Sequence, residues 1–180
     1  MPNQIVAHIR KQTESDRGDV ARLMNFTFGA ERTNRPVWHL RPGPPVDDLC
    51  FIAELEGRAV ACLRFWEIII AGFRQLLLGP LAVEPNIQGK GVGKSLVRAG
   101  LSHAERLGKW DVVLVSGDHD YYPQFGFQSV STSQILWPGP LESERLHMRA
   151  LRKDGETVLP PGPVALLAAR VAVGVQVVGA

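Results

Sequence analysis

The sequence predicts a single α/β (α+β) domain in which one mixed central sheet is flanked by helices. Three observations predict it: β-rich runs and amphipathic helical patterns share one chain, three β-rich runs follow one another directly, and a short, fully apolar run of the buried kind follows the second helix. A chain of 180 residues suits one domain and can bury a substantial core.

The first elements are a strand and a helix. Residues 5–11 alternate apolar and polar side chains, which predicts a strand. Asp16 then precedes an amphipathic helix as its cap. The apolar residues of this helix fall near helical spacing, at Val20, Leu23, Met24 and Phe28. Residues 32–48 are rich in Arg and Pro and predict a short helix that runs into a long loop.

Three sheet runs come next, at residues 49–57, 58–72 and 73–83. The first two are divided at Glu56 and Gly57, a good hairpin signal. The third carries Gly79 and Pro80 in its middle. These two residues should interrupt the hydrogen-bond ladder with a bulge or a splay.

A second helix is expected from near Gly91 to a glycine cap at Gly108. Its apolar face is marked by Leu96, Val97, Gly100, Leu101 and Ala104. Residues 111–117 predict a buried strand, residues 121–130 a turn and another strand, and residues 145–151 the last strand.

The composition of the chain changes near Gly155, where a Pro/Gly-rich stretch is followed by an almost wholly apolar one. We expect residues 1–152 to form the domain, and residues 153–180 to form a Pro/Gly-rich linker and an apolar tail. The tail is expected to pack on the domain or on a partner chain, with a frayed terminus as the alternative. It is compatible with a homodimer contact. Its length and its central Arg170 argue against a membrane span.

Composition excludes several classes of protein. The chain is 45% hydrophobic and 21% charged, as in an ordinary globular protein. Its formal charge of +2 is small and its Lys and Arg residues form no basic block, so no nucleic-acid partner is expected. We expect Cys50 and Cys62 to be small buried residues in neighbouring strands, without a disulfide. The first residues do not resemble a secretory signal, and a cytoplasmic protein with no membrane partner is expected.

The most informative stretch is QGKGVGKSL, at residues 88–96. A nucleoside-triphosphate loop would need its opening glycine at Gln88, whereas the glycine stands one residue later. The dinucleotide pattern fails because its third position is Lys94. Glycines still let the backbone approach a bulky anion, and the first amides of a helix are free donors. The plainer alternative is a glycine-rich turn that only caps the helix.

The pattern Q-x-x-G-x-G at Gln88, Gly91 and Gly93 stands between an apolar strand and a helix, and YYPQFGF follows at residues 121–127. Together they resemble the two signatures of the GNAT superfamily of N-acetyltransferases, and most of all an uncharacterised bacterial branch of it. The resemblance covers residues 5–151 in element order and is specific over residues 78–127. It implies a GNAT fold with one splayed strand pair.

The resemblance also implies a co-substrate, acetyl-coenzyme A, and no metal. The backbone groups of Leu81, Ala82 and Val83 would pair with the pantetheine arm, and one amide would polarise the thioester carbonyl. The residues implied for the pyrophosphate are Gln88, Gly89, Lys90, Gly91, Val92, Gly93 and Lys94.

The implied reaction is direct attack on the thioester by a primary amine of a small molecule or a protein. Tyr122 matches the family's tyrosine acid, and the alternative is a core tyrosine that packs beside Phe125 and Phe127. Tyr121 is the weaker candidate for this role and is expected to pack instead. The base is open: the strand before the loop offers no carboxylate, which departs from the family. Glu67, Asp118 and His119 are available as bases, but each is more often an ordinary surface or turn residue.

Acceptor selection should involve the Arg/Pro-rich segment, where an entrance favouring an acidic or aromatic group would be lined by Arg32, Arg35, Trp38, His39 and Arg41. The alternative is a solvated loop with Trp38 in the core. Two other functions stay open: a non-catalytic acyl-coenzyme-A-binding regulatory module and, more remotely, a P-loop-like nucleotidase.

Overall fold

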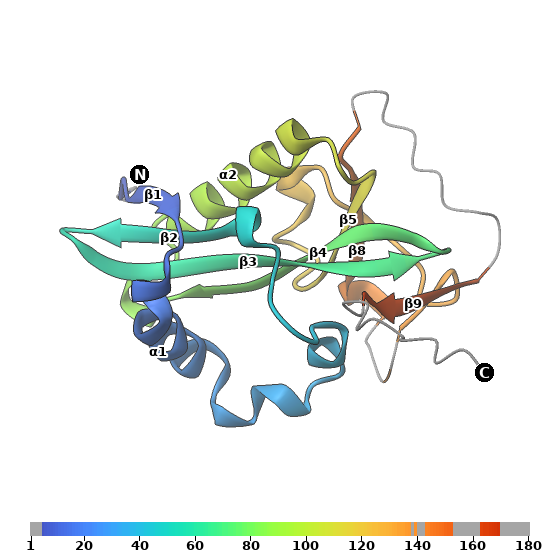
Figure 1. The fold of residues 1–180 in the computed structure, drawn as a ribbon, viewed down its shortest axis with the longest axis horizontal. Coiled ribbons are helices and arrows are strands. Elements are labelled where there is room, and N and C mark those ends of the chain that lie inside the picture. Colours follow the sequence, from blue (N-terminus) through green and yellow to red (C-terminus); the bar gives the residue numbers. More distant parts are fainter. Residues whose placement is uncertain (1–4, 138, 140–142, 153–162, 170–180) are drawn as a thin grey trace, which may run out of the picture.

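The computed structural model describes residues 5–137, 139, 143–152 and 163–169. These residues form one mixed sheet in the order β1-β2-β3-β4-β5-β8-β6, and β9 pairs with β3 and β7 (Figure 1). Helices lie on both faces of the sheet. The predicted fold class is therefore confirmed.

The amino-terminal half of the sheet is antiparallel. Strand β1 (His8–Lys11) pairs with β2 (Cys50–Leu55), and β2 pairs with β3 (Arg58–Ile70). The expected hairpin turn is confirmed at Glu56 and Gly57, where both residues have positive φ. Cys50 and Cys62 are buried on these neighbouring strands as free thiols, as predicted.

The two helices cover opposite faces of the sheet (Figure 1). Helix α1 (Arg17–Phe28) buries Val20, Leu23 and Met24 in a cluster with Cys62 and Ala82. Helix α2 (Val92–Leu107) packs its predicted apolar face against the other side, and Gly108 in a left-handed conformation ends it. Because each helix buries one stripe of side chains, the sheet is enclosed between them. Neither described helix is long and apolar enough to cross a bilayer.

Strands β4 (Phe73–Val83) and β5 (Val112–Ser116) separate along their length. They are parallel, and their register contains only two pairs, Leu76 with Val113 and Leu77 with Leu114. On its other edge β4 stays paired with β3 as far as Val83, with a register shift where Gly79 and Pro80 face Arg64. The predicted bulge and the splayed strand pair are both confirmed.

The segment between α1 and β2 contains short 3-10 turns in place of the one short helix predicted there. They are η2 (Ala30–Asn34), η3 (Pro36–Leu40) and η4 (Asp47–Leu49). Pro36 begins the second turn, and proline lacks the amide that a longer helix would need. Leu40 is buried under the sheet and fixes this segment against the core.

The carboxy-terminal part of the sheet contains β6 (Gln128–Ser129), β7 (Ile135–Leu136) and β8 (Leu146–Ala150). The prediction that β8 is the last strand is wrong. Strand β9 (Val164–Ala168) lies inside the segment expected as a tail and pairs with Ile68–Ile70 of β3. It adds to the edge of β3 that β2 leaves unpaired, because β2 ends opposite Arg64. Residues 153–162 and 170–180 of the tail prediction lie outside the described residues.

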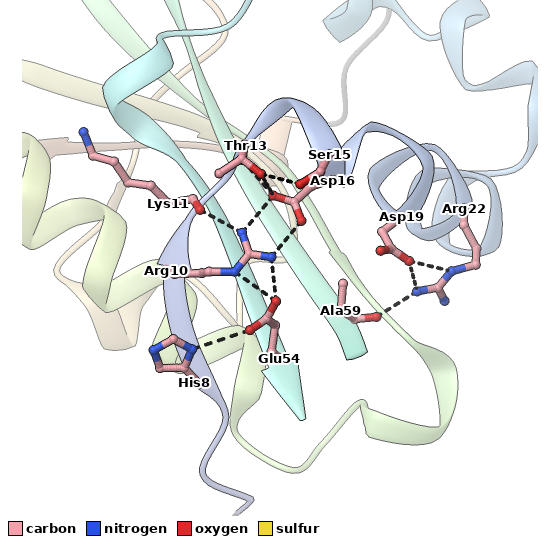
Figure 2. A network of polar contacts seen from close by, with 10 residues as sticks. All are labelled: His8, Arg10, Lys11, Thr13, Ser15, Asp16, Asp19, Arg22, Glu54 and Ala59. Carbon is pink, nitrogen blue, oxygen red and sulfur yellow. Dashed lines mark hydrogen bonds and ion pairs between the residues drawn. The ribbon is translucent and has the colours of Figure 1, made fainter. Parts of the chain in front are cut away.

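A buried ion network ties β1 to the start of α1 and to β2 (Figure 2). The guanidinium of Arg10 donates to both carboxylate oxygens of Asp16, at 2.7 and 2.8 Å, and to Glu54. Asp16 also accepts the backbone amide of Thr13 at 2.7 Å. Asp16 therefore does not cap α1 with its side chain as predicted, because its carboxylate is turned back toward Arg10 and Thr13.

The Arg10 guanidinium, and secondarily the Thr13 amide, hold the pKa of Asp16 well below its usual range. A depressed folded-state pKa stabilises the protein above the unfolded value of about 4, and this contribution is lost as pH falls below it. We expect Asp16→Asn to lower the free energy of unfolding by about 2–3 kcal/mol at pH 7. The difference between the two proteins should shrink in urea titrations repeated at decreasing pH below 4.

The matched control is Asp19→Asn, since Asp19 is partly exposed and, among the described residues, pairs only with Arg22 on the same helix. Its effect should stay within about 0.5 kcal/mol. Equal losses in the two variants, or an Asp16 effect that does not change with pH, would contradict the assigned role of the network.

Candidate active site

A cavity of about 760 Å³ lies where β4 and β5 separate. Leu78, Gly79, Pro80, Leu81 and Val83 of β4 line one side of it, and Val115, Ser116 and Gly117 line the other. The start of α2 and the segment after α1 complete the walls. A space of this size between two strands can take an extended organic ligand.

The outer edge of β4 presents free backbone groups to this cavity. The amide of Glu84 donates to Val60 on β3 at 2.9 Å, so the groups of Ala82, two residues earlier, also face β3. The groups of Leu81 and Val83 then point toward the gap. Ala82 is fully buried on the α1 side, so its side chain does not reach the cavity.

The glycine loop brings the start of α2 to the same cavity. Gly91 has φ of +88°, and its carbonyl accepts the first helical bond from Ser95 at 3.0 Å. The amides of residues 92–94 precede that bond and have no partner within the helix. The residues of the loop that line the cavity are Gln88, Gly89, Gly91, Gly93 and Lys94.

Two other predicted loop residues are placed differently. Val92 buries its side chain in the core, and only its backbone belongs to the free helix start. Lys90 is not part of the cavity wall; its carbonyl accepts the amide of Ile5 at 3.1 Å. Gln88 holds the loop to the strand, since its side-chain amide donates to the carbonyl of Val83 at 3.0 Å.

The first turn of α2 is a favourable environment for an anion. The helix dipole directs partial positive charge to this end, and Lys94 is exposed there. No acidic residue occurs between residues 88 and 94. The site therefore combines free amides, a cation and no repelling carboxylate within one turn.

Tyr122 lies in the cavity wall opposite the free edge of β4. Its ring is 8% exposed and packs against Phe127 and His147. Burial, and next the neighbouring Tyr121, raise the pKa of Tyr122 far above its usual value. The phenol therefore keeps its proton at any pH near neutral. The same holds for Tyr121, whose pKa burial raises to about 12.

Tyr121, the weaker of the two predicted tyrosine candidates, also lines the cavity. A Cβ built on Gly93 would lie 3.2 Å from the Tyr121 hydroxyl and 3.2 Å from Val83 Cγ2. The tyrosine hydroxyl, the end of β4 and the first turn of α2 thus converge at one point. Only a glycine fits there without displacing a neighbour.

The three predicted base candidates are separated by the fold. Asp118 lines the cavity, exposed, and its carboxylate accepts the amide of Asp120 at 2.8 Å. Glu67 is bonded to Trp110 and Arg74, away from the cavity wall. His119 is exposed beside Asp120. Among the described residues, Asp118 is thus the one acidic residue in the cavity wall.

The Arg/Pro-rich segment contributes Arg35, Trp38 and Arg41 to the cavity, whereas Arg32 and His39 are not in its wall. Trp38 contacts Phe28 edge to face and is only half-buried. Three of the five predicted entrance residues thus line the cavity, Trp38 is not in the core, and the role of the segment in acceptor selection stays a prediction. Further wall residues that sequence reasoning did not assign to the site are Thr27, Phe28, Trp137 and Arg145. Of these four, only Phe28 had been singled out in the sequence, as part of the apolar face of α1.

Comparison with known proteins agrees with this geometry. The family model described as an acetyltransferase (GNAT) domain matches residues 46–129. An uncharacterized N-acetyltransferase of Escherichia coli K12, YjhQ, is 33% identical over 157 residues, which cover 82% of this chain and 83% of YjhQ. A second one from the same organism, YhbS, is 24% identical over 146 residues, 79% of this chain and 87% of YhbS.

Two solved structures share the fold. The crystal structure of E. coli YhbS in complex with CoA has a TM-score of 0.72 at 24% identity and covers 88% of each chain. A GNAT family acetyltransferase from Brucella melitensis in complex with acetyl-CoA has a TM-score of 0.65 at 24% identity, covering 94% of this chain and 99% of its own.

The position of Tyr122 depends on Gly117, because a Cβ on Gly117 would lie 2.1 Å from Tyr122 Cε2. We expect Gly117→Ala to push the ring aside and to lower the free energy of unfolding by about 1–3 kcal/mol. Urea unfolding measures the loss, and a crystal structure of the variant shows the ring. The matched control is Gly18→Ala in α1, where a methyl group meets nothing within 4 Å and should not destabilise the protein. A Gly117→Ala protein with unchanged stability and ring position would contradict this packing.

Proposed function

The chain belongs to the GNAT family of acetyltransferases, and we propose that it transfers the acetyl group of acetyl-coenzyme A to a primary amine by direct attack. The observation that carries the proposal is the opening between β4 and β5, which leaves free backbone groups of β4 beside the free amides at the start of α2. The acceptor would be an amine of a small molecule or of a protein.

The coenzyme would lie along the opening like an added strand. The amides of its pantetheine arm would pair with the outward backbone groups of Leu81 and with the amide of Val83, whose carbonyl already accepts the Gln88 side chain. The backbone groups of Ala82 face β3 and would not pair with the arm. Its pyrophosphate would meet the amides of residues 92–94 and the side chain of Lys94. Gly89, Gly91 and Gly93 would allow the backbone to approach the phosphates closely, and Gln88 would hold the loop in place.

The chemical step forms a nitrogen–carbon bond and breaks the carbon–sulfur bond of the thioester. The amine must first lose a proton, because a simple alkylamine has a pKa near 10. Water or Asp118 would take this proton, since β4 carries no carboxylate. Tyr122 would donate a proton to the departing sulfur, a role that a phenol still protonated at neutral pH can fill.

A backbone amide at the irregular part of β4 would polarise the thioester carbonyl as negative charge develops on its oxygen. Such a donor typically contributes a few kcal/mol to a transition state. The absence of a carboxylate on β4 keeps one other function open, a regulatory module that binds acyl-coenzyme A without turnover. Family membership leaves no support for a nucleotidase.

We expect Tyr122→Phe to lower kcat about 100-fold, because the leaving thiolate loses its proton donor. The dissociation constant of acetyl-coenzyme A should change less than twofold, since the ring still fills its place. Thiol release with a panel of amines gives the rate, and calorimetry gives the affinity. An unchanged kcat would assign Tyr122 to packing alone, and coenzyme binding without release by any wild-type assay would favour the regulatory module.

We expect Lys94→Glu to weaken acetyl-coenzyme A binding about tenfold or more at low salt, because it reverses a charge beside the pyrophosphate. The loss should shrink as ionic strength rises. The matched control is Lys109→Glu, an exposed reversal just past the other end of α2. Thermal shift with acetyl-coenzyme A against ATP provides a second readout, because only a bound ligand raises the melting temperature. Equal effects of the two reversals would remove the pyrophosphate from this site.

A further inference from the structure

Arg41 is a largely buried cation for which the described part of the chain provides no carboxylate partner. Its Nε is fully buried and donates a hydrogen bond to none of the residues that the structure describes. No carboxylate among those residues pairs with its guanidinium either. In contrast, Arg10, Arg22 and Arg58 all bond to carboxylates. The guanidinium of Arg41 lines the cavity.

The location of Arg41 is the reaction end of the cavity. A Cβ built on Gly79 would lie 3.0 Å from Arg41 Nη2, so the guanidinium touches the irregular part of β4. Tyr122 is close enough to influence the pKa of Arg41. Gly79 precedes Val83 by four residues, or about 13 Å of extended chain. The pyrophosphate end, at Lys94, is therefore served by other groups.

Burial lowers the pKa of Arg41 to about 10, which still leaves it charged at neutral pH. An unpaired charge in such a place is unfavourable, and removing one partner of a buried pair is a costly change in proteins generally. The Trp38 ring, 4.8 Å from the guanidinium carbon, offsets only part of this. The arrangement suits a site whose missing partner is an anion delivered by a ligand.

The other charges of the wall agree with an anionic ligand. Arg35 and Arg145 also line the cavity, against the single carboxylate of Asp118. The planar guanidinium of Arg41 offers two parallel donors, the geometry that a carboxylate accepts in a bidentate manner. Trp38 and Trp137 add apolar surface around it.

We infer that Arg41 binds a carboxylate of the reacting substrates, and that this carboxylate belongs to the acceptor, an amine that also carries a carboxylic acid group. The inference rests on the proposed function. The acetyl group itself has no charge, and the coenzyme's phosphates are accommodated at the far end of the opening. A carboxylate could also arrive on the acyl group, and the experiment separates these two sources.

The experiment compares amino acids with their carboxamides as acceptors, with rates of thiol release expressed per unprotonated amine. The wild-type protein should prefer the carboxylate form by about tenfold or more in kcat/KM, and Arg41→Gln should reduce this ratio to near one. The dissociation constant of acetyl-coenzyme A should stay unchanged in the variant. Thermal unfolding checks that it is folded, and Arg41→Lys replaces it if it is not.

The matched control is Arg32→Gln. Arg32 also lies over the Trp38 ring, at 5.9 Å, but outside the cavity wall, so the preference should persist. A second arm pairs a carboxylate-free amine with acetyl- and succinyl-coenzyme A. A preference for succinyl-coenzyme A that depends on Arg41 would assign the carboxylate to the acyl group and overturn the acceptor assignment.

Two outcomes separate this inference from the proposed function. Equal rates with acids and carboxamides, or a preference that survives in Arg41→Gln, would overturn the inference and leave the transferase intact. No thiol release with any amine, in a protein that binds acetyl-coenzyme A, would instead overturn the transferase. As a readout independent of turnover, N-acetylated amino acids with coenzyme A should raise the melting temperature of the wild-type protein more than that of Arg41→Gln.

Discussion

The separation of β4 from β5 is the constraint on which the rest of this site depends. Two neighbouring strands normally satisfy each other's backbone groups, and β4 does so with β5 only at Leu76 and Leu77. Beyond these two residues, β4 remains paired with β3 after the register shift at Gly79 and Pro80, and the edge of β4 that faces β5 stays open. An open edge inside a protein is stable only when side chains, water or a ligand satisfy it. The strand therefore both builds the cavity wall and supplies its donors.

The two ends of the opening are lined by different kinds of chemical groups. The start of α2 gives one end free amides, a favourable dipole and Lys94, a combination suited to phosphate. The other end has Tyr122, which burial keeps protonated, and Arg41, which is charged and has no carboxylate partner among the described residues. Leu81 and the amide of Val83 lie between these ends, so in the proposed complex the coenzyme would run from its phosphates at one end to its reacting group at the other.

Two sets of contacts join the elements that surround the opening. The Arg10–Asp16–Glu54 network joins β1, β2 and the start of α1, and Glu84 at the end of β4 bonds to Arg22 and Arg58 (Figure 2 shows the first of these). On the other side, β9 continues the edge of β3 where β2 ends. The ladder between β3 and β4 and the Arg58–Glu84 pair join these two strands, whereas β4 and β5 share only two register pairs.

The sequence by itself determined the elements whose signals are local. The hairpin at Glu56 and Gly57, the apolar face of α2 and the bulge at Gly79 follow from spacing and backbone preference within a few residues. The glycine loop and the YYPQFGF stretch also indicated two segments that line the cavity. Tertiary structure decided what depends on distant residues. Examples are β9, which pairs with β3 across 96 to 100 residues of chain, the turning of Asp16 toward Arg10, and the exclusion of Glu67 from the cavity. Arg41 shows the reason most clearly, because its charge could be read from the chain, but its burial without a partner exists only once Trp38, Gly79 and Tyr122 surround it.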